Sequence, residues 1–264
     1  MGYSYKLGVI GCGNMAEAIV SRACGTVLKA SEIQVFDSDS AKLAALSSKY
    51  GVKAAYSNSE LVSSCEYVLF AVKPQSLGGL NIGNAAINCL ISIMAGVKIA
   101  TLKANFNVSR IVRVMPNTPC SVGVGMCALT FDGCTEKDKL FAKGLFNATG
   151  KTIELDESKF DAVTAVSGSG PAYVYYFIEA MTNGGVQEGL TYEESKTLAI
   201  QTVKGAAELA ERSDIELSVL IDRVCSKGGT TIEAVNYLKE KDVGAIVCEA
   251  VRRCAEKSRE LGKR

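Results

Sequence analysis

The stretch KLGVIGCGNMA, residues 6–16, decides the fold of this chain. Its apolar run leads into the pattern G-x-G-x-x-A, formed by Gly11, Gly13 and Ala16, and a helical pattern follows. Gly11 allows a tight turn, Gly13 lets the backbone approach a pyrophosphate, and Ala16 lets the helix pack closely on the strand. The start of the helix then offers N–H groups and a positive dipole end to phosphates. The pattern alone is weak, but its place between a strand and a helix predicts a dinucleotide site.

An acidic residue follows the next apolar run, at about the expected distance from the glycines. Asp37 comes about 20 residues after Ala16, where an acidic side chain usually binds the adenosine ribose and disfavours a 2′-phosphate. The alternative is that Asp37 or Asp39 only caps the following helix. The sequence supports both interpretations equally.

Strand and helix patterns alternate over the first part of the chain. The strand candidates are short, apolar and rich in β-branched residues, and they lie at 7–10, 33–36, 67–72, 90–94, 110–114 and 126–130. Such runs suit strands that are buried on both faces of a parallel sheet. The alternation predicts an α/β fold, a doubly wound sheet of the Rossmann type.

The last third of the chain has only helical patterns. We expect helices from Pro171, after the capping box Thr191–Glu194, after a second capping box at Thr230–Glu233, and over 243–261. The predicted division is a dinucleotide-binding domain over 1–157 and an all-helical domain over 158–264.

The composition excludes several classes of function. The formal net charge of +1 predicts no nucleic-acid partner and no polybasic membrane arm. The chain has no histidine, which removes histidine triads and histidine metal sites, and we expect no metal. Ten cysteines without C-x-x-C spacing are interpreted as buried free thiols in a reducing cytoplasm. No signal peptide and no membrane-spanning segment are expected.

Four polar loops are further candidates for ligand binding. Lys73 and Pro74 end one predicted strand and the loop 116–119 ends another, although an exposed lysine and a plain loop are the ordinary interpretations. The glycine-rich segments 167–172 and 226–231 each precede a predicted helix. Backbone N–H groups there suit a carboxylate or phosphate, whereas capping alone also explains Ser169 and Thr230.

Taken together, several motifs resemble the pyrroline-5-carboxylate reductase family over essentially the whole chain: GCGNMA, AVKPQ, SIMAGV, RVMPNTP, SGSGPAYVYYFIEA and SKGGTTIEAV. The resemblance implies the last step of proline biosynthesis, in which NADPH or NADH reduces (S)-1-pyrroline-5-carboxylate to L-proline. It also implies a helical dimerisation domain and a homodimer at least, since dimers of this family often assemble further, commonly to decamers.

The resemblance also assigns roles to residues of this sequence. The cofactor-binding residues would be Asp37 and Ser38 by their position, with Gly11, Cys12, Gly13, Asn14 and Met15 at the pyrophosphate, Asn58 as a further contact, and Ala71, Val72, Lys73, Pro74, Ile93, Met94 and Ala95 around the nicotinamide. The substrate loop would consist of Ser226, Gly228, Gly229, Thr230 and Thr231, whose backbone N–H groups hold the carboxylate. The Thr231 hydroxyl would face the ring nitrogen as the catalytic group.

Three positions depart from the family pattern. The family usually has proline at Lys227 and asparagine or glutamine at Arg223, the latter a cofactor contact from the partner subunit. The negative charge of Asp37 disfavours the 2′-phosphate of NADPH, the cofactor that the family often prefers.

Two alternative functions compete with this interpretation. A reductase of the β-hydroxyacid dehydrogenase type would share the glycine motif, but it normally has a catalytic lysine on the first long helix of its second domain, and residues 172–181 contain none. A non-catalytic dinucleotide sensor would leave the segment GGTT unexplained.

Overall fold

The computed structural model describes residues 2–262 of the chain. These residues form two compact units, of which unit 1 comprises the described residues up to Ser169 and from Cys254 onward, and unit 2 comprises Gly170–Arg253.

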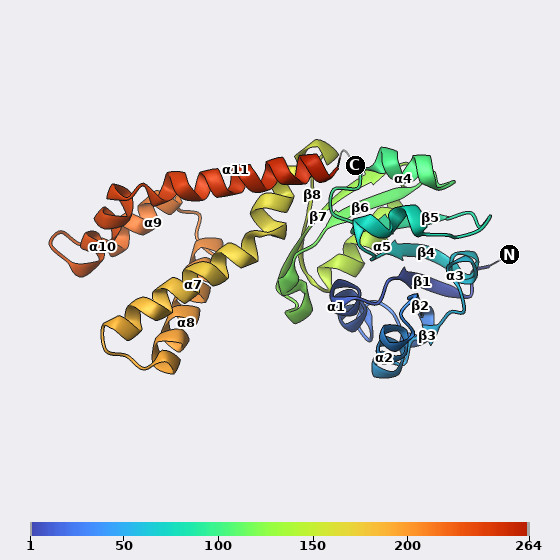
Figure 1. The fold of residues 1–264 in the computed structure, drawn as a ribbon, viewed down its shortest axis with the longest axis horizontal. Helices are drawn as coiled ribbons and strands as arrows, with labels where there is room; N and C mark the ends of the chain where they lie inside the picture. Colours follow the sequence, from blue (N-terminus) through green and yellow to red (C-terminus); the bar gives the residue numbers. More distant parts are fainter. Residues whose placement is uncertain (1, 263–264) are drawn as a thin grey trace. The chain divides into compact units, whose positions relative to one another are not determined.

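Unit 1 is built on an eight-stranded sheet with the order β3-β2-β1-β4-β5-β6-β7-β8 (Figure 1). All neighbouring strands are parallel except β6 and β7. The strands are β1 (Tyr5–Ile10), β2 (Ile33–Phe36), β3 (Lys53–Ala54), β4 (Cys65–Phe70), β5 (Cys89–Ser92), β6 (Ile111–Met115), β7 (Gly125–Asp132) and β8 (Gly150–Glu154). The doubly wound α/β prediction is confirmed.

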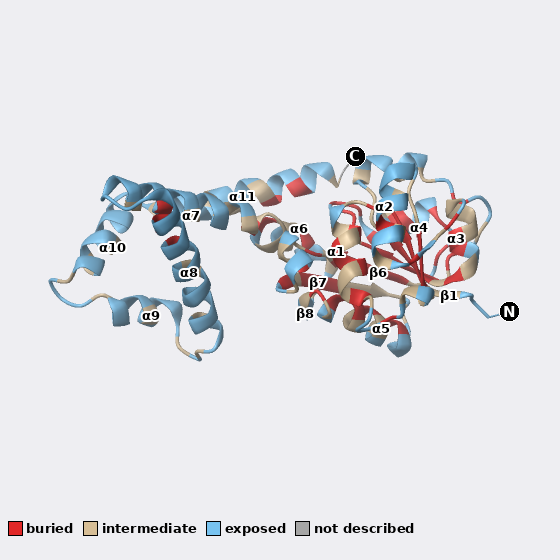
Figure 2. Cartoon of the chain, turned by 90° about the horizontal axis from the view of Figure 1, so that it is seen from below, coloured by how far each residue is buried: buried red, intermediate tan, exposed pale blue. Residues whose placement is uncertain are grey.

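Helices cover both faces of this sheet. The buried side chains of α1 (Asn14–Ala23), α2 (Ser40–Tyr50) and α5 (Glu136–Asn147) share one core with one face of the strands. Those of α3 (Asn58–Ser64) and α4 (Ile99–Asn105) pack on the other face. Figure 2 shows that the buried residues concentrate in and around the sheet.

The six predicted strands all exist, with ends that differ by a few residues from the prediction. The sequence contains no clear signal for β3 and β8, because β3 has only two residues and β8 has no buried residue and carries the polar side chains Lys151, Thr152 and Glu154. It also gave no sign that β7 runs antiparallel to β6. An antiparallel strand buried between two neighbours carries the same apolar run as a parallel one.

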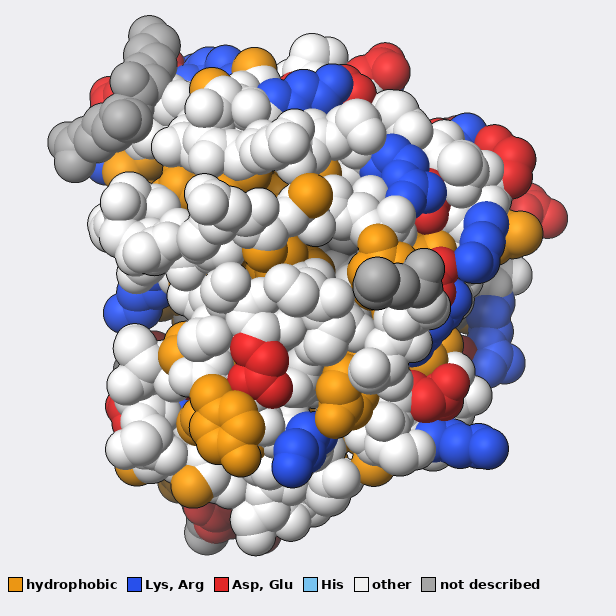
Figure 3. Space-filling view, turned by 90° about the vertical axis from the view of Figure 1, so that its right-hand side faces the viewer, with side chains coloured by type: hydrophobic (Ala, Val, Ile, Leu, Met, Phe, Trp, Pro, Cys, Tyr) orange, Lys and Arg blue, Asp and Glu red, His pale blue; other side chains and the backbone are white. Residues whose placement is uncertain are grey.

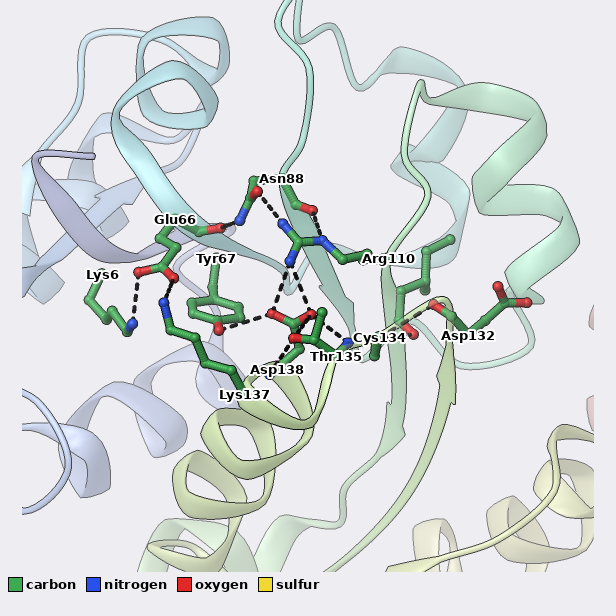
Figure 4. A network of polar contacts seen from close by, with 11 residues as sticks. Lys6, Glu66, Tyr67, Asn88, Arg110, Asp132, Cys134, Thr135, Lys137 and Asp138 are labelled. Atoms are coloured by element: carbon green, nitrogen blue, oxygen red, sulfur yellow. Dashed lines mark hydrogen bonds and ion pairs between the residues drawn. The ribbon is translucent and has the colours of Figure 1, made fainter. Parts of the chain in front are cut away.

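A polar network holds the edge of the sheet where β4, β5 and β6 begin (Figure 4). Asp138 on α5 accepts hydrogen bonds from the Tyr67 hydroxyl at 3.0 Å and pairs with Arg110 at 3.2 Å. Thr135 and Asp138 also form the capping box that begins α5. Burial raises the pKa of Asp138, but bonds from Thr135 and Tyr67 and the charge of Arg110 outweigh it and hold that pKa below its usual range.

The segment after β8 belongs to unit 1 and not to the helical unit. Phe160 is buried beneath the Arg113 guanidinium, which lies 4.8 Å from the ring centroid and pairs with Glu157 at 2.8 Å. The end of α11 (Val243–Leu261) returns to the same place, where Ser258 donates to Asp161 at 2.6 Å. The compact units therefore divide after Ser169, later than the predicted boundary at residue 157.

Unit 2 consists of helices, namely α7 (Gly170–Gln187), α8 (Tyr192–Glu211), α9 (Leu217–Val224), α10 (Thr230–Glu240) and the first part of α11. Helices α7 and α8 pack closely, because Gly185 leaves room for Ser195, which donates to the Thr182 carbonyl at 2.7 Å. Most other side chains of this unit are exposed, including large apolar ones such as Tyr176, Leu209 and Ile246.

The cysteines have no disulfide bonds among the described residues, in line with free thiols. The expectation that they are buried is only partly right, since Cys65, Cys89 and Cys127 are buried whereas Cys248 is exposed on α11. None of the described helices is both long and apolar enough to cross a bilayer. On the face of unit 1 seen in Figure 3, lysine and arginine side chains are interspersed with acidic ones.

Candidate dinucleotide and substrate sites

The carboxyl ends of three neighbouring strands meet where the strand order reverses. Gly11 follows β1, Asp37 follows β2 and Ala71 follows β4. Backbone hydrogen bonds join these ends, from Gly11 N to Phe36 O and from Ala71 N to Ile10 O, both at 2.8 Å. Such a reversal point is where open α/β sheets bind their ligands.

The glycine loop has the shape that the sequence predicts. Gly11 has a φ of +100°, and a Cβ atom there would lie 2.7 Å from the Ala71 carbonyl oxygen, so no other residue fits without a shift. A Cβ on Gly13 would meet open space. Helix α1 then begins without a side-chain cap, which leaves the N–H groups of its first turn available to phosphates.

The two alternatives for the acidic residues after β2 are separated by their contacts. Asp39 is the N-cap of α2, since it accepts hydrogen bonds from the backbone N–H groups of Ala41 and Lys42. Asp37 does not cap this helix. Its Oδ2 accepts from Cys12 N at 2.7 Å and its Oδ1 from Asp39 N at 2.8 Å. Asp37 therefore ties the glycine loop to the end of β2.

The thiol of Cys12 in this loop is unreactive. Its side chain is buried, and burial together with the neighbouring Asp37 carboxylate raises the pKa of Cys12 to about 12. The thiol thus stays protonated at neutral pH and is a poor nucleophile.

A cavity of about 430 Å³ opens at this edge of the sheet. Its lining includes eight of the predicted cofactor residues, Gly11, Gly13, Asp37, Ser38, Asn58, Ala71, Val72 and Lys73. The Asn58 side chain donates to Asn81 O at 3.2 Å, whereas its Oδ1 is buried and, among the described residues, has no partner. An acceptor of this kind fits a hydroxyl or amino donor of a dinucleotide.

The other predicted cofactor residues lie outside this cavity. Cys12, Asn14 and Met15 border neighbouring hollows along α1. Pro74 begins the short 3₁₀ helix η2 (Pro74–Gly79). Residues 93–95 follow β5, and Met94 is only 2% exposed, so its side chain packs in the core and only its backbone can border a ligand.

Several further residues line the cavity that no sequence motif marks. Ser76, Gly79 and Leu80 lie in or just after η2, and Phe36 ends β2. The only signal for η2 was Pro74 followed by Gly78 and Gly79, which indicates a turn but not its direction.

In unit 2, the segment 226–231 leads into α10 by a turn of two glycines. Gly228 has a φ of +71°, and Gly229 donates its N–H to Ser226 O at 3.0 Å. Gly229 is the N-cap and Thr230 the first helical residue, so the predicted capping box Thr230–Glu233 is wrong. The glycine turn places the start of the helix one residue earlier than the capping pattern predicts.

This helix start offers unshielded donors. No side chain caps α10, and Ser226, Thr230 and Thr231 are exposed. The N–H groups of the first turn together with these three hydroxyl groups can bind a carboxylate.

The other glycine-rich segment does not form a free helix start. A π-turn, η5 (Thr164–Gly168), runs directly into α7, and the Ser169 N–H donates to Thr164 O at 2.8 Å. The expectation of an anion site on a free helix start at 167–172 is therefore wrong.

Sequence comparisons place the chain among named proteins. Residues 157–261 match the family profile described as pyrroline-5-carboxylate reductase dimerisation, and residues 6–96 match one described as NADP oxidoreductase coenzyme F420-dependent. The pyrroline-5-carboxylate reductase of Synechocystis is 41% identical and covers 99% of this chain and 100% of its own. That of Arabidopsis thaliana is 38% identical and covers 98% and 96%.

Solved structures agree with these matches. Plasmodium falciparum pyrroline carboxylate reductase with NADP bound has a TM-score of 0.88 at 34% identity, with 99% of this chain and all of that chain covered. The Streptococcus pyogenes 1-pyrroline-5-carboxylate reductase has a TM-score of 0.89 at 27% identity, with 97% and 98% covered.

Proposed function

This chain belongs to the pyrroline-5-carboxylate reductase family, and from that premise we propose how its residues carry out the reaction. The enzyme reduces (S)-1-pyrroline-5-carboxylate to L-proline with NAD(P)H, the last step of proline biosynthesis. The observation that carries the residue assignment is that each unit has an uncapped helix start behind glycines, α1 after the glycine loop and α10 after Gly228 and Gly229.

The cofactor supplies the hydride, and the residues at the carboxyl edge of the sheet fit its binding. The first turn of α1 holds the pyrophosphate, and Asp37, Ser38 and Asn58 contact the adenosine half. Residues 71–74 and the backbone of 93–95 border the nicotinamide half. The close approach of Gly11 to Ala71 and the unpartnered Asn58 oxygen support this placement.

The substrate carboxylate binds at the start of α10. Backbone N–H groups of Thr230 and Thr231 donate to it, and the Ser226 hydroxyl adds a further donor. The exposure of these residues and the absence of a side-chain cap support this role. The positive end of the helix dipole favours the negative charge.

Thr231 is the proposed catalytic residue. A cyclic imine accepts hydride best as its iminium, so the reaction needs a hydrogen-bond partner at the ring nitrogen. The chain has no histidine, and a hydroxyl beside the carboxylate site is suited to donate or relay that proton. Holding both reactants in place supplies much of the remaining acceleration.

The experiment that tests this assignment is Thr231→Val, which keeps the side-chain shape and removes only the hydroxyl. We expect kcat/KM for pyrroline-5-carboxylate to fall by about 100-fold, the range for a lost general acid. The melting temperature should stay constant, because Gly229 and not Thr231 caps the helix. Thr197→Val, on the exposed side of α8, is the matched control. A Thr231→Val enzyme with wild-type kcat/KM would remove the hydroxyl from the mechanism and leave backbone N–H groups or water as proton source.

The chain assembles through its helical part, which matches the dimerisation profile over 157–261. The exposed apolar side chains of α7, α8 and α11 support a homodimer as the minimal unit, and a decamer is the larger assembly we propose. We place the enzyme in the cytoplasm, in keeping with its free thiols. Arg223 on α9 stands where the family usually has the asparagine or glutamine that contacts the cofactor from the partner subunit, and Lys227, after α9, stands where the family usually has proline.

A further inference from the structure

The side-chain amide of Asn117 joins three segments that are far apart in the sequence. Its Oδ1 accepts the Met126 N–H of β7 at 2.9 Å. Its Nδ2 lies 3.3 Å from the Ser167 carbonyl oxygen and 3.4 Å from the Ser167 hydroxyl, both in the π-turn η5. Because protein groups already form hydrogen bonds with both the oxygen and the nitrogen of the amide, Asn117 links the loop to β7 and to the π-turn and does not contact a ligand.

The loop that carries Asn117 follows β6 at the same edge of the sheet as the cofactor cavity. Strand β6 neighbours β5, whose following residues 93–95 border the proposed nicotinamide position. At the other end of the loop, the helix η3 (Thr118–Val122) packs on α1, and Thr118 and Ser121 line the same hollow as Asn14 and Met15 at the start of α1. The loop therefore lies between the proposed nicotinamide position after β5 and the start of α1, and a shift of the loop would affect both.

The prolines of this loop do not explain its position. Pro116 and Pro119 fix their own φ angles, but their side chains have no hydrogen-bonding group that could hold the π-turn or β7. Gly168 of the π-turn lies against Met115, since a Cβ there would come within 2.4 Å of the Met115 Cε atom. This close contact and the Asn117 amide together hold the turn against the end of β6. Single π-turns are rare and often mark functional places.

We propose that Asn117 is a positioning residue for hydride transfer. It locks the loop 115–118 between the π-turn and β7, so that the nicotinamide edge of the sheet keeps one shape. The inference rests on the proposed placement of the nicotinamide at this edge.

The sharpest variant is Asn117→Asp, which has the same shape. Its Oδ1 still accepts the Met126 N–H, but its second oxygen faces the Ser167 carbonyl oxygen and cannot donate to it. Asn117→Ala removes both bonds. Asn105→Asp on α4 is the matched control, because it replaces an amide that donates only to Thr101 O within its own helix.

We expect kcat with pyrroline-5-carboxylate to fall at least tenfold in both Asn117 variants and to stay unchanged in Asn105→Asp. The Kd of NADPH, measured by its fluorescence in the absence of substrate, should change less than threefold. The primary deuterium isotope effect from deuterated NADPH should increase, because hydride transfer becomes the slower step.

A merely structural role gives a different pattern. If Asn117→Asp keeps the wild-type kcat and isotope effect, or fails to fold, the amide serves the fold alone and the proposal is refuted. A Kd that weakens as much as kcat, with an unchanged isotope effect, refutes it as well, because the loop would then only shape the binding cavity. Absence of turnover in the wild-type enzyme would instead refute the assigned reaction.

Discussion

Replacing Asp37 by serine tests how this chain chooses between NADH and NADPH. The carboxylate of Asp37 accepts two backbone hydrogen bonds, from Cys12 at 2.7 Å and from Asp39 at 2.8 Å, and it lines the cofactor cavity. Asp37 therefore holds the glycine loop and presents a negative charge to the cavity, where we propose that the adenosine ribose binds. The substitution removes both effects at once.

Removing the hydrogen bonds weakens cofactor binding, whereas removing the negative charge favours only the binding of NADPH. A hydrogen bond to a charged group contributes about 1.5–3 kcal/mol. Loss of the Cys12 tether weakens both cofactors, whereas loss of a bond to the ribose 2′-hydroxyl weakens only NADH. Two like charges 4 Å apart repel by about 1 kcal/mol in water and about 4 kcal/mol at an effective dielectric near 20, which weakens only NADPH in the wild type. Lys42, which pairs with Asp39 at 3.2 Å, offsets part of that repulsion.

We therefore expect wild-type kcat/KM for NADH to lie within about tenfold of that for NADPH, a difference of about 1.4 kcal/mol or less. In Asp37→Ser, kcat/KM for NADH should fall at least about tenfold, since about 1.4 kcal/mol or more is lost. NADPH should lose much less, so the ratio of the two shifts toward NADPH by about tenfold. Steady-state rates with both cofactors at saturating pyrroline-5-carboxylate measure the ratio.

Asp39→Ser is the matched control, because serine remains a good N-cap for α2 and the net charge changes by the same amount. Its cofactor ratio should stay within about threefold of wild type, about 0.7 kcal/mol. An Asp37→Ser enzyme with an unchanged ratio would show that the carboxylate does not face the ribose. Equal shifts in both variants would show that only the general charge of this edge matters.

Three further predictions follow from the contacts described. Gly11→Ala should weaken NADPH binding more than tenfold in titrations while the chain still folds, because a Cβ there would lie 2.7 Å from the Ala71 carbonyl oxygen and the φ of +100° is unfavourable for alanine. Asp138→Asn should lower the free energy of unfolding at pH 7 by about 2–3 kcal/mol in urea melts. The depressed pKa of Asp138 stabilises the fold above its unfolded value near 3.9, so wild-type stability should fall as pH drops below about 4, and the variant should lose less there. Light scattering with activity assays should find no active monomer at micromolar concentration, because the exposed apolar side chains of the helical unit need a partner.

The core of the sheet could be predicted from the sequence because each central strand is a short, continuous apolar run. The residues of the glycine loop were equally readable, since a tight turn and a close backbone approach permit few other residues. The role of Asp37 was not readable in the same way. Distance along the chain suggested a ribose contact or a cap, and only the fold shows that its oxygens reach the Cys12 N–H.

The connections across the chain were not predictable at all. Asn117 and Ser167 lie 50 residues apart, and neither has a pattern around it that names the other. The sequence marked both segments as polar loops with glycine or proline, which is a local property. Their contact depends on the packing of β6, β7 and the π-turn, which no local pattern encodes.

Some helices of this chain start with a side-chain cap, whereas others start behind a glycine and have no such cap. Helices α2, α5 and α8 have the N-cap residues Asp39, Thr135 and Thr191, whose side chains accept hydrogen bonds from first-turn N–H groups. Helices α1 and α10 begin after Gly13 and Gly229, which have no side chain to do so. A cap satisfies the same donors that an anion would use, so a capped start competes with ligand binding and an uncapped glycine start invites it. The sequence pattern T-T-I-E suggested a cap at α10 because capping rules consider the hydroxyl and ignore the glycines before it. Two glycines ahead of a possible cap are therefore the stronger signal, and here they mark the proposed phosphate site in one unit and the proposed carboxylate site in the other.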